Sequence, residues 1–198
     1  MNNILPLGLS LLLGLVINHS LANDATTIST QPVATTTDAV KSLQHQLERI
    51  HSFSASFIQL TQDGLGTTLQ KVEGFMQVAK PGKLRWQTGG VYEQLVISDG
   101  QSLWIYDADL EQVSIKDMDN RLSETPALLL SGDISAIDND FIITQIPNDH
   151  LLLFLLKPRD SSQLFDSLEL SFNKLDNFQP LTKMVIRDAS GQITDISF

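Results

Sequence analysis

Residues 74–113 constrain the fold more than any other stretch, because short β-forming runs alternate there with turn signals. Ser98-Asp99-Gly100 is typical of a hairpin turn, and it separates the runs 93–97 and 102–107. Lys80-Pro81-Gly82 ends an earlier run in the same way. This stretch predicts a meander of antiparallel strands.

The predicted strands are apolar on both faces. In the run 102–107, Leu103 and Ile105 point to one face while Trp104 and Tyr106 point to the other, since side chains alternate along a strand. A sheet that is apolar on both faces needs two covers. One cover can be a helix, and the other must be a second layer, a partner or a ligand.

Period-two alternation predicts further strands along most of the chain. They lie at residues 54–61, 67–79, 83–88, 110–115, 141–146, 151–157, 164–172, 181–187 and 192–198. In the run 164–172 large apolar residues alternate with Ser167, Glu169 and Ser171, which predicts one dry face and one wet face. Gly74 lies inside a long run and predicts a bend or bulge.

Two helical regions interrupt the β pattern. Val40, Leu43, Leu47 and Ile50 recur at helical spacing behind Asp38, a suitable N-cap, so this helix should cover one face of the sheet. Residues 125–132 and 134–140 predict two short helices.

The first short helix carries three consecutive leucines, Leu128, Leu129 and Leu130, which cannot all face one core. Either two apolar surfaces clamp this helix, or one side of it covers a cavity. The fold class is therefore mainly β with short α: a strongly curved antiparallel sheet, or unclosed β-barrel, with an N-terminal helix and an inserted helical lid.

Composition excludes several functional classes. The chain has no cysteine, which rules out disulfides, thiolate nucleophiles and lipid attachment through an N-terminal cysteine. Its net charge of −10 repels phosphate backbones and anionic membrane surfaces, so nucleic-acid binding is not expected.

The chain divides into three parts. Residues 1–22 are typical of a cleaved signal peptide, with an apolar core and a small-x-small site at Ser20-Leu21-Ala22; an uncleaved membrane anchor is the alternative. Residues 23–37 predict a flexible Thr-rich arm, and residues 38–198 predict the folded domain of an exported protein.

No residue pattern indicates catalysis. The histidines are scattered, the paired aspartates lack a calcium-loop frame, and no nucleophile, metal site or cofactor motif is present. The apolar content remains, and it fits either a well-filled core or a ligand cavity. The curved two-sided sheet and the leucine-rich helix favour the cavity.

Seven segments resemble a known family in their order and spacing, over about residues 40–198. They are 52–59 (SFSASFIQ), 78–86 (VAKPGKLRW), 98–106 (SDGQSLWIY), 110–112 (LEQ), 125–130 (TPALLL), 156–158 (LKP) and 188–192 (DASGQ). This set resembles the periplasmic outer-membrane lipoprotein carrier family, LolA. The resemblance implies an unclosed β-barrel that holds lipoprotein acyl chains under a helical lid.

The resemblance also implies the partners and the site. The family takes acylated lipoproteins from an inner-membrane ABC-type release complex to an outer-membrane receptor, as a periplasmic chaperone without catalytic residues or cofactors, and we expect a monomer. The expected lipid-binding residues are Leu84, Trp86, Val96, Trp104, Leu128, Leu129 and Leu130. Lys80 stands where the family often has an arginine that latches the lid.

Two further departures matter. Leu84 replaces the family's aromatic residue, and the family usually continues past the position of Phe198, which leaves open an incomplete C-terminus or a different barrel closure. Two alternatives belong to other classes. The similar outer-membrane receptor would need a lipidated cysteine, whereas an exported β-fold hydrolase or small-ligand binding protein would not.

Overall fold

A computed structural model describes residues 36–91, 93–117, 126–135, 137–160, 165–175 and 181–198. Contact clustering divides the chain at residue 30, and all the described residues belong to the second unit, residues 31–198. The predicted signal peptide and most of the predicted arm therefore lie outside the described residues.

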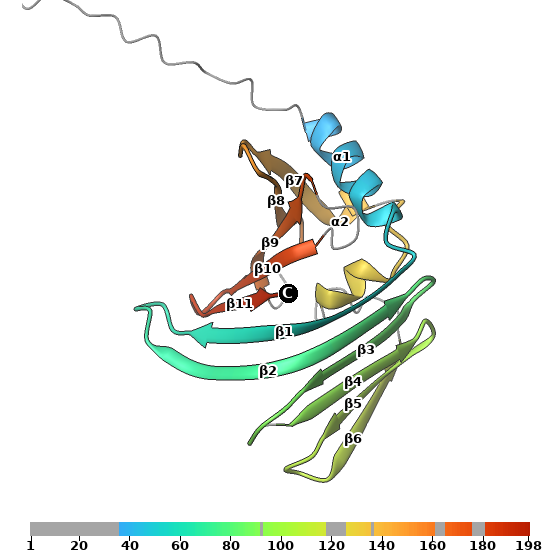
Figure 1. Cartoon of the computed structure of the whole chain (residues 1–198). Coiled ribbons are helices and arrows are strands. Elements are labelled where there is room, and N and C mark those ends of the chain that lie inside the picture. Colours follow the sequence, from blue (N-terminus) through green and yellow to red (C-terminus); the bar gives the residue numbers. More distant parts are fainter. Residues whose placement is uncertain (1–35, 92, 118–125, 136, 161–164, 176–180) are drawn as a thin grey trace, which may run out of the picture. The chain divides into compact units, whose positions relative to one another are not determined.

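The second unit is built on one antiparallel sheet of eleven strands, ordered β6-β5-β4-β3-β2-β1-β11-β10-β9-β8-β7 (Figure 1). The strands are β1 (Ser52–Gln62), β2 (Thr68–Ala79), β3 (Lys83–Thr88), β4 (Gln94–Asp99), β5 (Ser102–Asp107), β6 (Gln112–Asp117), β7 (Phe141–Ile146), β8 (Leu151–Pro158), β9 (Phe165–Asn173), β10 (Leu181–Asp188) and β11 (Ile193–Ser197). Every predicted strand is present. β6 and β7 each pair with one described neighbour, so the predicted unclosed sheet is confirmed.

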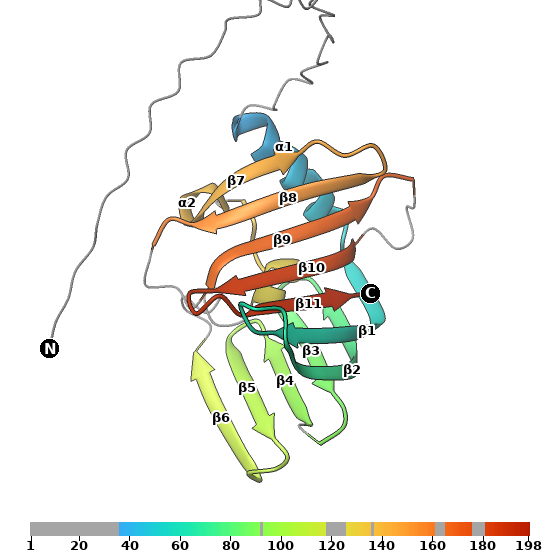
Figure 2. The ribbon, with the colours of Figure 1, turned by 90° about the vertical axis from the view of Figure 1, so that its left-hand side faces the viewer.

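The sheet consists of two meanders joined by strands that are far apart in the sequence. β1 pairs with β11, and Ile58 lies opposite Ser197 (Figure 2). Hairpin signals reveal pairs of consecutive strands only, so no local signal in the sequence indicates this pairing.

Helix α1 (Thr36–Glu48) confirms the predicted N-terminal helix and packs against β7. It begins at Thr36, two residues before the predicted start of the folded domain at residue 38. Its stripe of Leu43 and Leu47, followed by Ile50, is buried. Among the described residues, no helix is both long and apolar enough to span a bilayer.

The predicted leucine-rich helix is a 3-10 turn, η2 (Pro126–Leu130), and a single α-helical turn, α2 (Ile137–Asp140), follows it. A 3-10 helix has three residues per turn, so three consecutive side chains point in three directions. Leu128, Leu129 and Leu130 are nevertheless all buried, at 1%, 1% and 0% exposure. Apolar surfaces therefore surround η2, as the clamped alternative predicts, and strands β1–β3 curve beneath it (Figure 1).

The prediction at Gly74 was a bend or a bulge, and the structure excludes the bulge. Gly74 pairs regularly with Phe57 and Thr88, and the register of β1 and β2 shifts instead between Thr61 and Gln62. A Cβ at Gly74 would overlap the ring of Phe57 and approach the carbonyl oxygen of Gln87. The glycine is needed because an aromatic ring lies flat across the backbone there.

The predicted wet face of β9 is also corrected. Ser167 and Ser171 are buried and Glu169 is half-buried. Ser171 lies between Leu153 of β8 and Lys183 of β10, whose longer side chains flank the small serine on both sides. Alternation identifies the two faces of a strand correctly, but it does not reveal what neighbouring strands place over a small residue.

Candidate functional site

Three of the predicted lipid-binding residues share the inner face of β3 and β4, the face that η2 covers. Trp86 lies directly opposite Val96, and Leu84 lies two residues before Trp86 on the same side of β3. Their exposed fractions are 2% for Leu84, 9% for Trp86 and 7% for Val96. Leu84 and Trp86 share this face because they are two residues apart on β3, and the register of β3 and β4 adds Val96.

Aromatic rings extend this inner face towards β1. Phe57 stacks on Trp86 with 4.1 Å between ring centroids, and Phe198 meets both rings edge-on at 6.2 Å and 6.4 Å. These two phenylalanines were absent from the expected site. Alternation within 54–61 places Phe57 on one face of β1, but only the pairing of β1 with β11 brings Phe198 close to it.

The leucines of η2 fill the space above this surface. Leu128, Leu129 and Leu130 belong to the same buried cluster as Leu84, Trp86 and Val96. Leu43 and Leu47 of α1 belong to it as well. The structure therefore brings six of the seven predicted lipid-binding residues into one continuous apolar interior.

Trp104 is the exception and corrects the prediction. The register places it opposite Ile97 on one side and Ile115 on the other, whereas Val96 lies opposite Ile105. Trp104 is therefore on the outer face of the sheet, and it is only half-buried. The apolar run 102–107 contains residues of both faces, and the prediction assigned Trp104 to the same face as Leu84, Trp86 and Val96.

The η2 segment, residues 126–135, is fastened at two places. The Gly82 N–H, in the turn between β2 and β3, donates to the Ser131 carbonyl at 2.7 Å. The Gln44 side chain of α1 donates through Nε2 to the carbonyls of Ile134 and Ser135, both at 3.1 Å. In both places the accepting groups are backbone carbonyls of residues that follow η2.

Lys80 takes a different partner from the one expected for a latch. Its Nζ donates to the Leu47 carbonyl at 2.7 Å, at the end of α1, whereas a latch would bind the lid itself. A helix C-terminus offers carbonyls without intrahelical partners, and α1 presents one there. The β2–β3 turn thus holds α1 through Lys80 and the η2 segment through Gly82.

Electrostatic interactions also affect the contacts around Lys80. Burial lowers the pKa of Lys80, while the carboxylates of Glu48 and Asp133 act in the opposite direction. The pKa of Asp133 is lowered mainly by the hydrogen bonds that its carboxylate accepts from Ser135, with a smaller effect of Lys80. Asp133 belongs to the η2 segment, so its charge links that segment electrostatically to Lys80.

Ser98 supports the turn that makes these contacts. Its Oγ donates to the Gly82 carbonyl at 2.7 Å and accepts from the Gly100 N–H at 3.1 Å. Gly82 has a φ of 69°, and a Cβ there would press on the Cα of Gly100. The β2–β3 turn is therefore held in place by contacts with the β4–β5 turn, and it can act as a rigid anchor.

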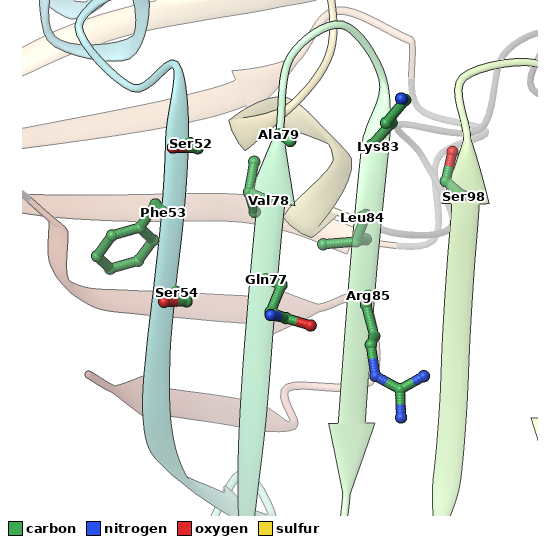
Figure 3. A pocket seen from close by; sticks show the side chains of 10 residues that line it. All are labelled: Ser52, Phe53, Ser54, Gln77, Val78, Ala79, Lys83, Leu84, Arg85 and Ser98. Carbon is green, nitrogen blue, oxygen red and sulfur yellow. The ribbon is translucent and has the colours of Figure 1, made fainter.

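A hollow of about 500 Å³ lies near the β2–β3 turn end of the same strands (Figure 3). Its lining combines outer-face residues, including Gln77 and Lys83, with inner-face residues, including Val78 and Leu84. It is open and half polar, so it differs from the apolar interior under η2.

The chemistry of the interior is that of an apolar binding surface. Among the described residues, no group of three or more histidine, aspartate or glutamate side chains could hold a metal ion. The side chains under η2 are hydrocarbon and aromatic groups, which bind by removing apolar surface from water. The polar groups nearby hold the η2 segment in place.

Comparisons with known proteins identify the family to which the chain belongs. Residues 48–198 match the family described as "Outer membrane lipoprotein carrier protein LolA". An "Outer-membrane lipoprotein carrier protein" of Pseudomonas aeruginosa is 45% identical over 162 residues, covering 81% of this chain and 75% of the relative. One from Azotobacter vinelandii is 42% identical over 160 residues, with the same coverage.

Among solved structures, a LolA superfamily protein from Nitrosomonas europaea covers 80% of this chain and 90% of its own, with a TM-score of 0.44 and 14% identity. The family match extends over most of the chain and includes all eleven strands, η2 and the β2–β3 turn. The chain belongs to the outer membrane lipoprotein carrier protein family, LolA.

Proposed function

We propose that this protein is a periplasmic chaperone that carries lipoproteins by binding their acyl chains on the inner face of the curved sheet. The binding surface comprises Leu84, Trp86 and Val96, and η2 acts as a lid that moves aside. The observation that carries the proposal is a continuous apolar face covered by a 3-10 turn of five residues, not by a long helix.

Energetics support such an exchange. Each methylene removed from water contributes about 0.8 kcal/mol, whereas a hydrogen bond contributes about 0.5–1.5 kcal/mol net. The hydrogen bonds from Gly82 and Gln44 to the η2 segment are few. An acyl chain that takes the place of the lid leucines replaces their buried hydrocarbon with its own. A few further methylenes then offset the lost hydrogen bonds.

The route follows from the family. We propose that the carrier accepts lipoproteins from an inner-membrane ABC-type release complex and delivers them to an outer-membrane receptor. The net charge of −10 suits a carrier that contacts membrane proteins without adsorbing to anionic lipid. Binding and release need no bond to be made or broken, so no catalytic group is invoked.

The test uses an apolar fluorescent probe and a triacylated lipopeptide with the purified protein. We expect the probe to bind in a protected site and the lipopeptide to displace it, because both compete for the same inner face. A deacylated peptide of the same sequence is the control and should leave the probe bound. Probe fluorescence that the lipopeptide leaves unchanged would contradict the proposal.

A further inference from the structure

The inner face of the sheet becomes polar at one end of β3. The η2 segment is fastened at Gly82, just before β3 begins, and Trp86 continues the apolar surface along that strand. Two residues later, on the same side, Thr88 lies opposite Gln94, and Gln94 lies opposite Asp107. Within one step along the strands the face therefore changes from aromatic and hydrocarbon groups to hydroxyl, amide and carboxylate groups.

Another hollow, of about 150 Å³, lies at this polar end, and Val72 and Thr88 form part of its lining. Pockets that hold a whole small molecule measure about 300–1,000 Å³, so this one suits a single polar part of a larger ligand. Its lining also includes Gln59, which comes two residues after Phe57 on the same face of β1, and Phe57 stacks on Trp86. A ligand on the proposed acyl surface can therefore extend into the hollow.

Three glutamine side chains in the lining make no hydrogen bond to any residue that the structure describes. They belong to Gln59, Gln70 and Gln94, of which the first two are half-buried. A primary amide offers two donors and one carbonyl acceptor, so the three amides can bind both the carbonyl oxygens and the N–H groups of a ligand. The ester and amide links between acyl chains and an acylated peptide present these groups.

The hollow also carries negative charge. Glu93, Asp107 and Asp109 contribute carboxylates to its lining. The Leu110 N–H donates to the Asp107 carboxylate at 3.2 Å. The Gln87 amide donates to the Glu93 carboxylate at 3.2 Å. Both donors are uncharged, so they leave the charge of the hollow in place.

The cations of β1–β6 lie away from this hollow. By alternation, Lys71, Lys83 and Arg85 point to the outer face of β2 and β3. Lys116 is on the inner face, but it lies opposite Leu103, at the other end of the strands. Strands β1, β4 and β5 contain no lysine or arginine. None of these six strands therefore places a cation at the hollow.

We propose that this hollow binds the polar group that joins the acyl chains of a lipoprotein to its peptide. The inference rests on the proposed function, because the acyl chains lie on the apolar inner face and extend from the hollow towards η2. The amides of Gln59, Gln70 and Gln94 bind the ester and amide groups. The carboxylates repel a phosphate in the same place, so the carrier distinguishes an acylated peptide from an anionic phospholipid with the same chains.

The first test measures displacement of the apolar probe from the purified protein by the triacylated lipopeptide. Gln59→Met and Gln94→Met replace two amides by apolar side chains of similar length. The affinity for the lipopeptide should fall about tenfold in the double variant, because hydrogen bonds to the ligand are lost, while the affinity for the probe should not change. Gln77→Met, on the outer face of β2, is the matched control and should behave like the parent.

Melting temperatures show whether the variants are folded. Gln94 is exposed at the start of β4, so Gln94→Met alone puts folding least at risk, and it should weaken lipopeptide binding by itself. A lipopeptide affinity that both substitutions leave unchanged would overturn the proposal.

The second test compares the lipopeptide with phosphatidylglycerol that carries the same acyl chains, both as competitors of the probe. The parent should prefer the lipopeptide. Asp107→Asn with Asp109→Asn should raise the affinity for phosphatidylglycerol about tenfold without lowering that for the lipopeptide, because the repulsion of phosphate is removed. Glu73→Gln, at an exposed carboxylate on the outer face of β2, is the control. Equal phosphatidylglycerol affinity in the parent and the double variant would contradict the role of the carboxylates.

A third measurement locates the head group directly. A nitroxide on the peptide, next to the acylated residue of the lipopeptide, should broaden the amide signals of Thr88 and Gln94 more than that of Lys83. Lys83 is at the opposite end of β3, about 16 Å from Thr88. Stronger broadening at Lys83 would place the head group beside η2 and overturn this proposal alone. Failure of the lipopeptide to displace the probe from the parent would instead contradict the acyl site itself.

Discussion

β9 and β6 both carry large apolar residues between polar ones, yet their surroundings differ. β9 is buried along most of its length, on both faces, while β6 is exposed at every position except Lys116. β9 lies between β8 and β10, whereas β6 pairs with β5 alone among the described strands. An apolar residue in a strand is therefore buried only where neighbouring elements cover it: Leu168 and Leu170 of β9 are covered, whereas Val113 and Ile115 of β6 are not.

The same contrast extends to the two meanders. In the β7–β11 meander, Phe141, Phe154 and Phe172 are fully buried, and α1 packs on β7. In the β2–β6 meander, the inner face is covered by a short 3-10 turn and the outer face is open. We interpret the first meander as the rigid frame and the second as the part that exchanges partners.

The largest expected effect breaks the frame. Phe172→Ala removes a fully buried ring and should lower the free energy of unfolding by about 3–5 kcal/mol. Phe75→Ala removes the same ring from the outer face of β2 and should cost less than about 1 kcal/mol. Urea unfolding of both variants measures the difference, and equal costs would refute the contrast between frame and exchanging meander.

The second prediction concerns Leu84→Glu, inside the exchanging meander. We expect the protein to fold with η2 displaced, because a carboxylate under the closed lid must be hydrated and a movable lid permits this. Acyl-probe binding should fall, and amide hydrogen exchange at residues 128–131 should accelerate. Leu84→Met is the control and should behave like the parent. Global unfolding of Leu84→Glu would place Leu84 in a sealed core instead.

The third prediction tests the lid fastening. Gln44→Met removes the donor to Ile134 and Ser135, and Lys80→Leu removes the donor to Leu47. Each should favour the open lid by about 0.5–1.5 kcal/mol, the net worth of about one hydrogen bond. Lys80→Arg should favour the closed lid, since a guanidinium offers more donors.

Because α1, the η2 segment and the β2–β3 turn form one closed ring of contacts, the effects of Gln44→Met and Lys80→Leu should not add. Hydrogen exchange at residues 128–131 of the ligand-free single and double variants measures this coupling. Lys41→Met, on the exposed side of α1, is the control. Protection equal to the parent in every variant would eliminate Lys80 and Gln44 as latches.

The smallest effect compares the two edge strands. Ile115→Thr on β6 should change the free energy of unfolding by less than about 0.5 kcal/mol, because the side chain is already in water. Ile143→Thr on β7 buries a hydroxyl in the frame and should cost about 2 kcal/mol. Thermal unfolding of both proteins tests this, and a destabilised Ile115→Thr would mean that β6 is covered.

Local signals predicted much of the fold and part of the site. The hairpin at Ser98-Asp99-Gly100, the stripe of α1 and the shared face of Leu84 and Trp86 all follow from periods of two or 3.6 residues. Trp104 was misplaced because periodicity separates two faces without indicating which one will be covered. The bulge alternative at Gly74 was wrong because the ring that requires the glycine belongs to another strand.

By itself the sequence determined the strands, their hairpins and the apolar character of both faces, since these depend on residues a few positions apart. Only the tertiary structure decided that β1 meets β11, that Phe198 joins Phe57 and Trp86, and that Lys80 reaches α1 rather than η2. It also decided which apolar face lies under the lid and which faces water. These choices depend on contacts between residues tens to more than a hundred positions apart, and no local spacing carries that information.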